Sequence, residues 1–251
     1  MPFIPILAVQ TMKTIFFVIL LLLLSPTGSV VVLHNMYNRY HGHWHKTFHF
    51  IQETERYRND SLVRKETWHE AMSYPYLFRI DITGPANGNS YICNKDSAWR
   101  FKNGQLVNRS ANVNEFVFLL GGMYHYTFDS VLARFAALGF SIGKYYNSTW
   151  KGKAAYVIGA NTDGERSNQL WIDKEKLVPV RYIRYDDTLK EEALFEEHIL
   201  LAGSWVETKA IFYSNGHLLQ VETYHDCVVN DPIDDRNFDP ALFGKYYWYK
   251  K

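Results

Sequence analysis

Hydrophobic and polar positions alternate along much of the chain in short runs rich in aromatic and β-branched residues. This period-two pattern, bounded by polar turns, is typical of β-strands. Three Asn-Gly pairs, at positions 87–88, 103–104 and 215–216, lie between such runs and indicate hairpin turns. Strands in series with short links favour one antiparallel sheet. The predicted strands are 46–57, 62–72, 76–83, 90–93, 98–101, 154–160, 169–173, 180–185, 193–201, 205–213 and 218–229.

One of these predicted strands, 62–72, carries charged residues on both faces. The alternation places Glu66, Trp68 and Glu70 on one face, and Lys65 and His69 on the other. Because neither face is purely apolar, this strand is expected at a rim or in a partly wet part of the sheet.

Three segments have helical rather than strand patterning. Residues 30–40 place apolar side chains near helical spacing, and residues 114–120 are short and very apolar. The third, 129–138, has Asp129 as a candidate N-cap and Gly139 as the residue that ends it. The last two segments lie together between two groups of strands. In a mostly β, α+β layout they are expected to cover one open face of the sheet.

The first residues have the pattern of a secretory signal peptide. Lys13 precedes an apolar run at 15–24, and small residues follow at 25–29. This run is too short to cross a bilayer, which requires about 20 apolar residues. We therefore expect a signal peptide at 1–29, with Met12 as a second candidate start. The remaining chain, 30–251, is expected to be a single domain that works outside the cytoplasm.

Charge and composition exclude some classes of function. The chain has 27 Lys and Arg against 26 Asp and Glu, a net charge of +1. No basic run is present of the kind that drives sequence-independent nucleic-acid binding, so no nucleic-acid partner is expected. The chain has 7 Trp, 18 Tyr and 16 Phe, and its 47% hydrophobic residues are sufficient for a large core. No cofactor is predicted.

Cysteine and histidine patterns leave one question open and predict no metal site. Cys93 and Cys227 are compatible both with a disulfide and with two unpaired thiols, because sequence separation does not fix a Cα distance. His41, His43 and His45 would point the same way in an extended segment. Solvated histidines at a strand entrance are commoner than ligands, so no metal is expected.

A serine-hydrolase motif supports an alternative hypothesis. Residues 139–143 match G-x-S-x-G around Ser141, and Asp186 and His198 follow in the order of a hydrolase triad. The nucleophile elbow requires a strand before the serine and a helix after it, whereas a helical pattern precedes Ser141. We keep a serine esterase as the minor alternative and expect a protein that is not an enzyme.

Several short motifs occur in a fixed order over nearly the whole chain after residue 29. Phe48, Phe50 and Gln52 lie on the first strand, and Phe238-Asp239-Pro240 lies near the end. Between them stand the stretches 68–71, 74–81, 99–104, 170–173 and 177–181. In this order they resemble the LolA/LppX-like periplasmic lipoprotein carriers. The resemblance implies an unclosed antiparallel β-barrel of about 10–12 strands, covered by short lid helices and enclosing an apolar cavity for acyl chains.

The function implied by this resemblance is that of a soluble, monomeric periplasmic carrier or binding protein. Its ligands would be lipoproteins or other acylated or apolar molecules, exchanged with transfer proteins of the inner and outer membranes. Tyr74 departs from the family pattern, because the carriers have a release-controlling arginine directly before this proline. A lipid-sensing interaction module on the same fold is the second hypothesis, because one fold hosts many functions.

Large apolar side chains on the predicted strands and helices are the candidates for the cavity. Each buried CH₂ contributes about 0.8 kcal/mol, so a concave apolar space and a movable cover are sufficient to hold an acyl chain. The candidate lining residues are Phe48, Phe50, Trp68, Leu77, Trp99, Phe101 and Trp171. The candidate lid residues are Phe116, Leu119, Leu120, Leu132 and Phe135.

Overall fold

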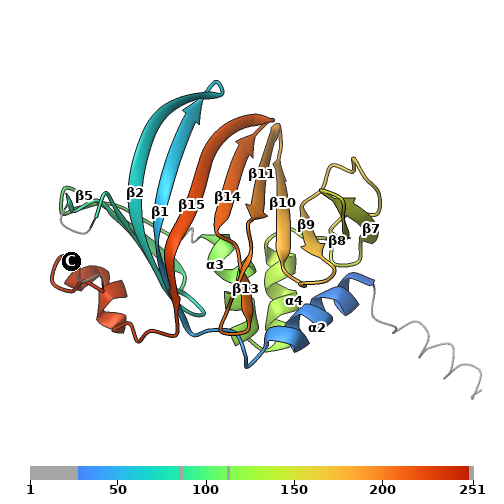
Figure 1. The fold of residues 1–251 in the computed structure, drawn as a ribbon, viewed down its shortest axis with the longest axis horizontal. Helices are drawn as coiled ribbons and strands as arrows, with labels where there is room; N and C mark the ends of the chain where they lie inside the picture. The colour runs from blue at the N-terminus through green and yellow to red at the C-terminus, as the bar shows by residue number, and fades with distance from the viewer. Residues whose placement is uncertain (1–27, 85–86, 112–113, 249–251) are drawn as a thin grey trace, which may run out of the picture.

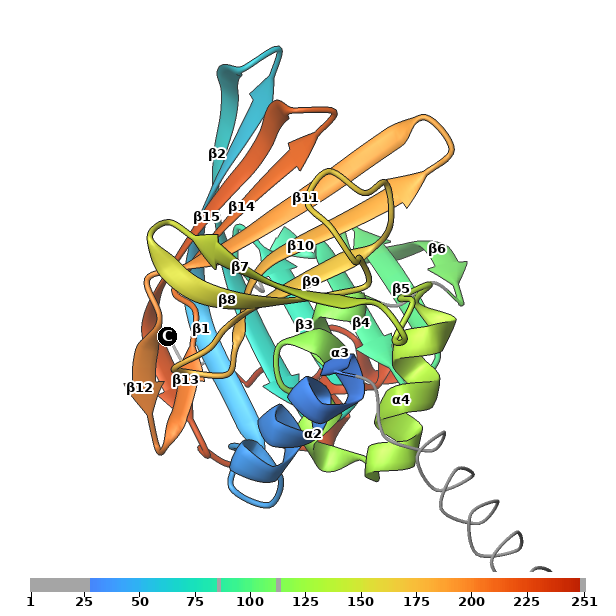
Figure 2. The ribbon, with the colours of Figure 1, turned by 90° about the vertical axis from the view of Figure 1, so that its right-hand side faces the viewer.

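The computed structural model describes residues 28–84, 87–111 and 114–248. They form a 13-stranded antiparallel sheet with strand order β6-β5-β4-β3-β2-β1-β15-β14-β11-β10-β9-β8-β7. The end strands β6 and β7 do not pair with each other, so the curved sheet is an unclosed barrel (Figures 1 and 2). The strands are β1 (Thr47–Arg58), β2 (Ser61–Ser73), β3 (Leu77–Ile82), β4 (Ser90–Asn94), β5 (Ser97–Lys102), β6 (Gln105–Ser110), β7 (Tyr145–Trp150), β8 (Lys153–Ile158), β9 (Gln169–Asp173), β10 (Pro179–Asp186), β11 (Leu189–Glu196), β14 (Lys209–Ser214) and β15 (His217–Val229).

Two of the Asn-Gly pairs form the tight hairpins that the sequence predicts. Asn103 and Gly104 have φ values of 50° and 78° between β5 and β6. Asn215 and Gly216 have φ values of 49° and 83° between β14 and β15. Positive φ at both central residues matches the right-handed twist of the flanking strands, and asparagine and glycine tolerate it best.

The helices gather at one end of the barrel, and the longest strands extend toward the other (Figure 1). They are α2 (Gly28–Tyr40), α3 (Glu115–Leu119), the 3₁₀ turn η2 (Gly122–His125) and α4 (Phe128–Ala137). The N-cap of α4 is Thr127 rather than Asp129, because its side chain accepts a hydrogen bond from Ser130 N at 3.4 Å. Gly139 follows the C-cap with φ 80°, which confirms its predicted role at the helix end.

The main core lies between these helices and the inner face of the sheet. It combines Leu33 and Met36 of α2, Val131 and Phe135 of α4, and strand residues such as Phe50. Alternation along the strands leaves every second side chain on the outer face, where separate smaller clusters form.

The C-terminal segment covers the outer face of β3 and β4. It contains the 3₁₀ turns η3 (Asp235–Phe238) and η4 (Pro240–Leu242). Phe238 is fully buried against Leu77 and Ala71, and Arg79 donates to Asn237 O at 2.8 Å. The outer face of this part of the sheet is therefore as well buried as its inner face.

The structure corrects several element boundaries. The segment 193–213 divides into four strands, because β12 (Ile199–Leu201) and β13 (Ser204–Val206) form a separate two-stranded ribbon. Two strands absent from the prediction, β6 and β7, are the edges of the sheet. Of the predicted signal peptide, residues 1–27 lie outside the described part of the chain, and α2 begins at Gly28. In the parts of the chain that the structure describes, none of the helices has the length and apolar character needed to cross a membrane.

Candidate ligand-binding cavity

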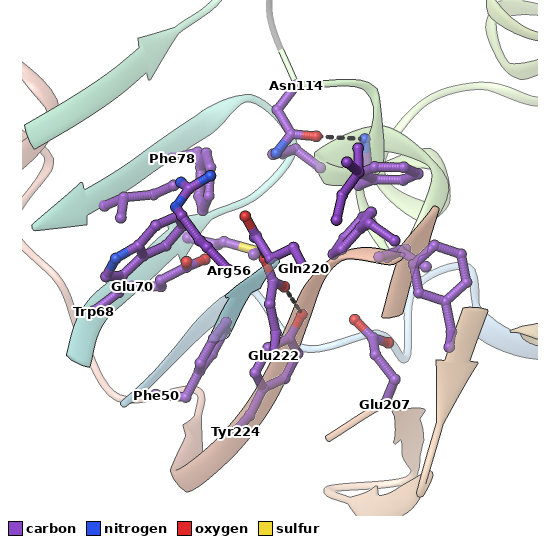
Figure 3. A pocket seen from close by; sticks show the side chains of 18 of the residues that line it. Phe50, Arg56, Trp68, Glu70, Phe78, Asn114, Glu207, Gln220, Glu222 and Tyr224 are labelled. Atoms are coloured by element: carbon purple, nitrogen blue, oxygen red, sulfur yellow. Dashed lines mark hydrogen bonds between the residues drawn. The ribbon is translucent and has the colours of Figure 1, made fainter. Parts of the chain in front are cut away.

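A cavity of about 560 Å³, here called the inner cavity, lies between α3 and the inner face of the sheet (Figure 3). Beyond it, a wider hollow of about 1140 Å³, here called the outer hollow, shares Arg56, Trp68, Phe116 and Phe212 with it. The inner cavity is lined by Phe50, Arg56, Tyr57, Arg58, Val63, Trp68, Glu70, Met72, Phe78, Ile80, Asn114, Phe116, Val117, Leu120, Phe195, Glu207, Phe212, Leu219, Gln220, Glu222 and Tyr224.

Strand register brings the walls of the inner cavity together. Phe50 of β1 lies opposite Glu70 of β2, and its ring stacks on Tyr224 of β15 with centroids 4.3 Å apart. Residues two apart share a face, so Trp68 and Met72 stand on either side of Glu70. The wall therefore mixes large apolar side chains with carboxyl groups.

Helix α3 closes the cavity opposite these strands. Asn114 caps the helix by accepting a hydrogen bond from Phe116 N at 2.9 Å. The Phe116 ring packs edge-on against Tyr182 and Phe195, with centroids 5.2 and 5.5 Å apart. The cap and these ring contacts place Phe116 and Leu120, one turn apart, along the cavity wall.

Three glutamates, here called the acid cluster, are buried in the inner cavity. Glu70, Glu207 and Glu222 are exposed by only 5%, 8% and 8%. Figure 3 shows Glu70 and Glu222 reaching the cavity from neighbouring parts of the sheet, with Glu207 on the other side. Burial of a carboxylate is costly unless the group is paired or protonated.

Burial raises the pKa of all three carboxyl groups. It raises the pKa of Glu207 to about 8 and that of Glu222 to about 6. It raises the pKa of Glu70 well above its ordinary value, with a further increase from the negative charge of Glu222. Two neighbours on β15 oppose this effect at Glu222: Tyr224 Oη donates at 2.8 Å, and Gln220 Nε2 donates to the other oxygen.

The entrance carries the positive charge nearest to the acid cluster. The Arg56 guanidinium lies 5.2 Å from the centre of the Trp68 ring, and its Nε is 3.4 Å from Glu66 Oε2. Its charge lowers the pKa of Glu222, against the larger effect of burial. Glu66 also pairs with Arg64 at 2.7 Å, so both arginines of the entrance contact this outer glutamate.

The structure places the seven predicted lining residues in four environments: the inner cavity, the core, the border of the outer hollow and the outer face of the sheet. Phe50 and Trp68 line the inner cavity, and Phe48 is packed in the core beside Phe50, with ring centroids 4.8 Å apart. Phe101 borders the outer hollow, but its ring stacks on Phe243 of the C-terminal segment at 4.0 Å.

The assignment of Leu77, Trp99 and Trp171 to the cavity needs correction. Leu77 packs on the outer face with Phe238, and Trp171 packs there with Ala155 and Val157. Trp99 follows Ala98, which belongs to an inner cluster, so alternation turns Trp99 outward. Large apolar side chains occupy both faces of this sheet, and residue type alone does not distinguish them.

The five predicted lid residues also divide into two groups. Phe116 and Leu120 of the α3 region line the inner cavity. Leu119 and Phe135 are fully buried in the main core, and Leu132 packs against that core. In the structure, contact with the cavity is therefore made by α3, whereas α4 supports it from behind.

The two cysteines are free, which answers the question that their spacing left open. Cys93 lies on β4 and Cys227 on β15, and the strand order puts β3, β2 and β1 between them. A disulfide between positions separated by three strands would need the sheet to rearrange.

Ser141 lacks the geometry of a hydrolase nucleophile. It is exposed, with α4 before it and β7 after it, which reverses the strand-to-helix order of the elbow. His198 Nε2 is 3.2 Å from Pro179 O on another part of the sheet. This geometry does not support the esterase alternative.

The clustered histidines do not converge on one site. His41 Nδ1 is 2.8 Å from Tyr124 O, whereas His45 is buried against the rings of Trp44 and Phe48. Within residues 28–84, 87–111 and 114–248, no group of three His, Cys, Asp or Glu side chains has the arrangement of a metal site.

Comparison with known proteins identifies the architecture. No family model and no curated protein sequence matches the chain. A DUF1329 family protein from Desulfovibrio piger superposes with a TM-score of 0.60 at 14% identity, over 86% of this chain and 97% of that one. A LolA superfamily protein from Nitrosomonas europaea gives 0.55 at 14% identity, over 84% and 97%. The fold is LolA-like.

A third solved structure has the same LolA-like fold. It is an outer membrane lipoprotein-sorting protein domain from Vibrio parahaemolyticus, with a TM-score of 0.59 and 11% identity. The superposition covers 85% of this chain and 97% of that one. At these identities the comparisons establish the shared architecture, and the expected unclosed barrel with covering helices is confirmed.

The acid cluster is the part of the cavity that sequence reasoning missed. A signal was present, because Gln220, Glu222 and Tyr224 alternate on one face of a long predicted strand, as Trp68 and Glu70 do on another. Glutamate on a strand is most often solvated, so the alternation alone did not distinguish a buried acidic wall from an exposed one.

Proposed function

We propose that this protein is a periplasmic carrier or binding protein that holds the acyl chain of a lipoprotein or lipid. The supporting observation is the inner cavity, a concave space of about 560 Å³ with aromatic and aliphatic walls. Volumes and linings of this kind are typical of sites for small apolar ligands. The LolA-like architecture is consistent with the proposal, and one neighbour of that fold is named for lipoprotein sorting.

The energetics of an acyl chain in this cavity are favourable. Burial of roughly ten methylene groups contributes about 8 kcal/mol before costs. Loss of translational and rotational freedom removes several kcal/mol of this, which leaves affinity in the range of a reversible carrier. No catalytic group is needed for such a function.

Tyr74 widens the class of ligands that we propose. It stands where the lipoprotein carriers have an arginine that controls release. Its ring stacks on His125 with centroids 5.5 Å apart, and its Oη contacts Met72 Sδ at 3.3 Å. Because a packed, neutral side chain replaces a charged one, we propose that release does not use this position and that the cargo extends to apolar ligands other than lipoproteins.

Native mass spectrometry tests the proposed function directly. The protein would be purified from its own envelope without detergent, and anything bound would then be extracted and identified. A stoichiometric acylated adduct is the expected result. An empty protein that also ignores added lipids and a fluorescent acyl probe would refute the carrier function and favour an interaction module on the same fold.

Substitution in α3 tests whether this helix covers the ligand. Phe116→Asp puts a charge into the apolar wall, and we expect retention of an acyl probe to fall about tenfold or more. Leu120→Asp should have the same effect, measured by the dissociation rate of the probe in folded protein.

The matched control for these variants is Val107→Asp, on an exposed position of the edge strand β6. Its retention of the probe should equal that of the unmodified protein. Unchanged retention in folded Phe116→Asp and Leu120→Asp would contradict the assignment of α3 as the cover.

A further inference from the structure

We propose that the ligand enters the inner cavity polar end first, and that this end is a primary amine which docks on Glu70, Glu207 and Glu222. The inference rests on the proposed function and adds the chemical class of the ligand to it.

Glu70 is a buried carboxyl group without a partner. It is 95% buried and lines the cavity, and within the described chain it makes no hydrogen bond or ion pair. Figure 3 shows its carboxyl group directed into the space that it shares with Gln220 and Glu222. Buried polar groups in native proteins are almost always paired, so an unpaired one directed into a cavity indicates a missing ligand group.

The other two members of the cluster leave acceptor capacity open in the same place. Glu207 accepts a hydrogen bond from its own backbone N–H, and Glu222 accepts from Tyr224 and Gln220 and interacts with the side chain of Gln52. A carboxylate has about four lone-pair sites, so each can still accept from a ligand. The nearby Gln52 Oε1 is also buried without a partner.

Among the described residues, no lysine or arginine lies within ion-pair distance of Glu70, Glu207 or Glu222, and Arg56 acts on Glu222 only from a longer distance. Glu66, four residues before Glu70 on β2, has both Arg56 and Arg64 within ion-pair distance. Glu70 lies opposite Phe50 of β1, whereas Glu66 and Glu222 lie on the two sides of Thr54, nearer the strand tip. Both arginines therefore pair with Glu66 and leave the carboxyl groups of the acid cluster without an ion-pair partner.

A hydrocarbon end would fit this part of the cavity poorly. It would cover the carboxyl groups of Glu70 and Glu207 without giving either a hydrogen-bond partner. A primary ammonium has three donors and a positive charge, which suits a cavity lined by three buried carboxyl groups. The apolar walls formed by Phe78, Phe116 and Phe212 then remain for the chain of the ligand.

Protonation of the cluster is coupled to binding of the amine. The titratable or charged side chains that face it are Glu70, Glu207, Glu222, Arg56, Tyr57, Arg58, Tyr74, Tyr224 and Cys227. Burial keeps the pKa of Glu207 at about 8, so at neutral pH this group carries a proton in the empty cavity. An ammonium favours the ionised carboxylates, so its binding releases protons.

A matched series of alkyl ligands tests the inference. Dodecylamine, dodecanol, dodecane and dodecanoate would compete with a fluorescent acyl probe at neutral pH. We expect dodecylamine to bind about tenfold more tightly than dodecanol, because its hydrogen bonds to the carboxylates are charge-assisted. Dodecanoate should bind most weakly, because like charges repel in the cavity.

Isosteric variants assign the preference to the cluster. Glu70→Gln and Glu222→Gln should bring the ratio of amine to alcohol affinity close to one while dodecane binding is kept. Glu191→Gln is the matched control, because it removes the same charge from the outer hollow and should leave the ratio unchanged. Calorimetry in two buffers of different ionisation enthalpy should show proton release with the amine and none with dodecane.

The outcomes separate this inference from the proposed function. If all four ligands displace the probe equally, or if Glu70→Gln and Glu222→Gln keep the amine preference, the polar-end assignment is overturned and the carrier function stands. If the unmodified protein binds neither the probe nor any of the four ligands, the carrier function itself is refuted.

Discussion

Two carboxyl groups on neighbouring strands, Glu70 of β2 and Asp81 of β3, are buried to almost the same extent, 5% and 1% exposed. They face opposite sides of the sheet. Asp81, on the outer face, contacts the Arg79 guanidinium at 3.0 Å, and the C-terminal segment covers the pair. Glu70, on the inner face, has a cavity in front of it instead. The comparison shows that one sheet buries carboxyl groups in two settings: one is ion-paired beneath a segment of its own chain, and the other faces a cavity.

Breaking the outer pair should have the largest effect on stability. Arg79→Met leaves Asp81 buried without its cation and removes the hydrogen bond to Asn237 O. We expect the free energy of unfolding to fall by about 3–5 kcal/mol, measured by urea denaturation. Arg100→Met, at an exposed position on β5, should change it by less than about 0.5 kcal/mol. Equal decreases in the free energy of unfolding for the two variants would show that the Arg79–Asp81 pair does not stabilise the fold.

The inner cluster should make stability depend on pH. The pKa of Glu207 is raised in the folded protein to about 8, so this group contributes stability below its unfolded pKa that is lost as pH rises through 8. We expect the free energy of unfolding to decrease by about 2 kcal/mol between pH near 6.5 and alkaline pH near 9. Glu207→Gln should flatten this dependence, and a slope that is unchanged in this variant would contradict the role of Glu207.

Removal of the Glu70 carboxyl group should have the smallest effect on the free energy of unfolding, and this effect should be stabilising. Glu70→Met replaces an unpaired buried carboxyl group with an apolar side chain, and we expect it to raise the free energy of unfolding by about 1 kcal/mol. Glu66→Met, four residues away, breaks two ion pairs and should lower it instead. The stabilities of the two variants would be compared by thermal unfolding at the same pH. Destabilisation by Glu70→Met would mean that this carboxyl group has a partner in the folded chain.

Much of the architecture could be predicted from local patterning. Asn103-Gly104 and Asn215-Gly216 require positive φ at two successive positions, and they form the expected hairpins. Strand β7 was missed because its residues, such as Asn147 and Ser148, are polar or only half-buried at the edge of the sheet. In a strand of six residues, these polar positions leave too few apolar ones for a period-two pattern to stand out.

The site was less accessible to sequence reasoning than the fold. Trp171 and Trp68 are both buried aromatic residues on strands, yet one faces outward and the other lines the cavity. The difference depends on register, and a shift of one residue exchanges the two faces. Both faces are covered here, so hydrophobicity does not identify the inner one. The acid cluster depends in addition on contacts between Glu70 and Glu222, which are 152 positions apart (222 − 70 = 152) and become neighbours only when β15 joins β1.

The unpaired edges of the sheet have a mechanical consequence. In a closed barrel, the number of strands and their shear fix the circumference, and any widening breaks ladder hydrogen bonds. Here β6 and β7 end the strand order without pairing, so a change in the twist of the sheet alters the width of the barrel without breaking ladder hydrogen bonds. For the proposed carrier, this would let ligands of different cross-section occupy the same cavity.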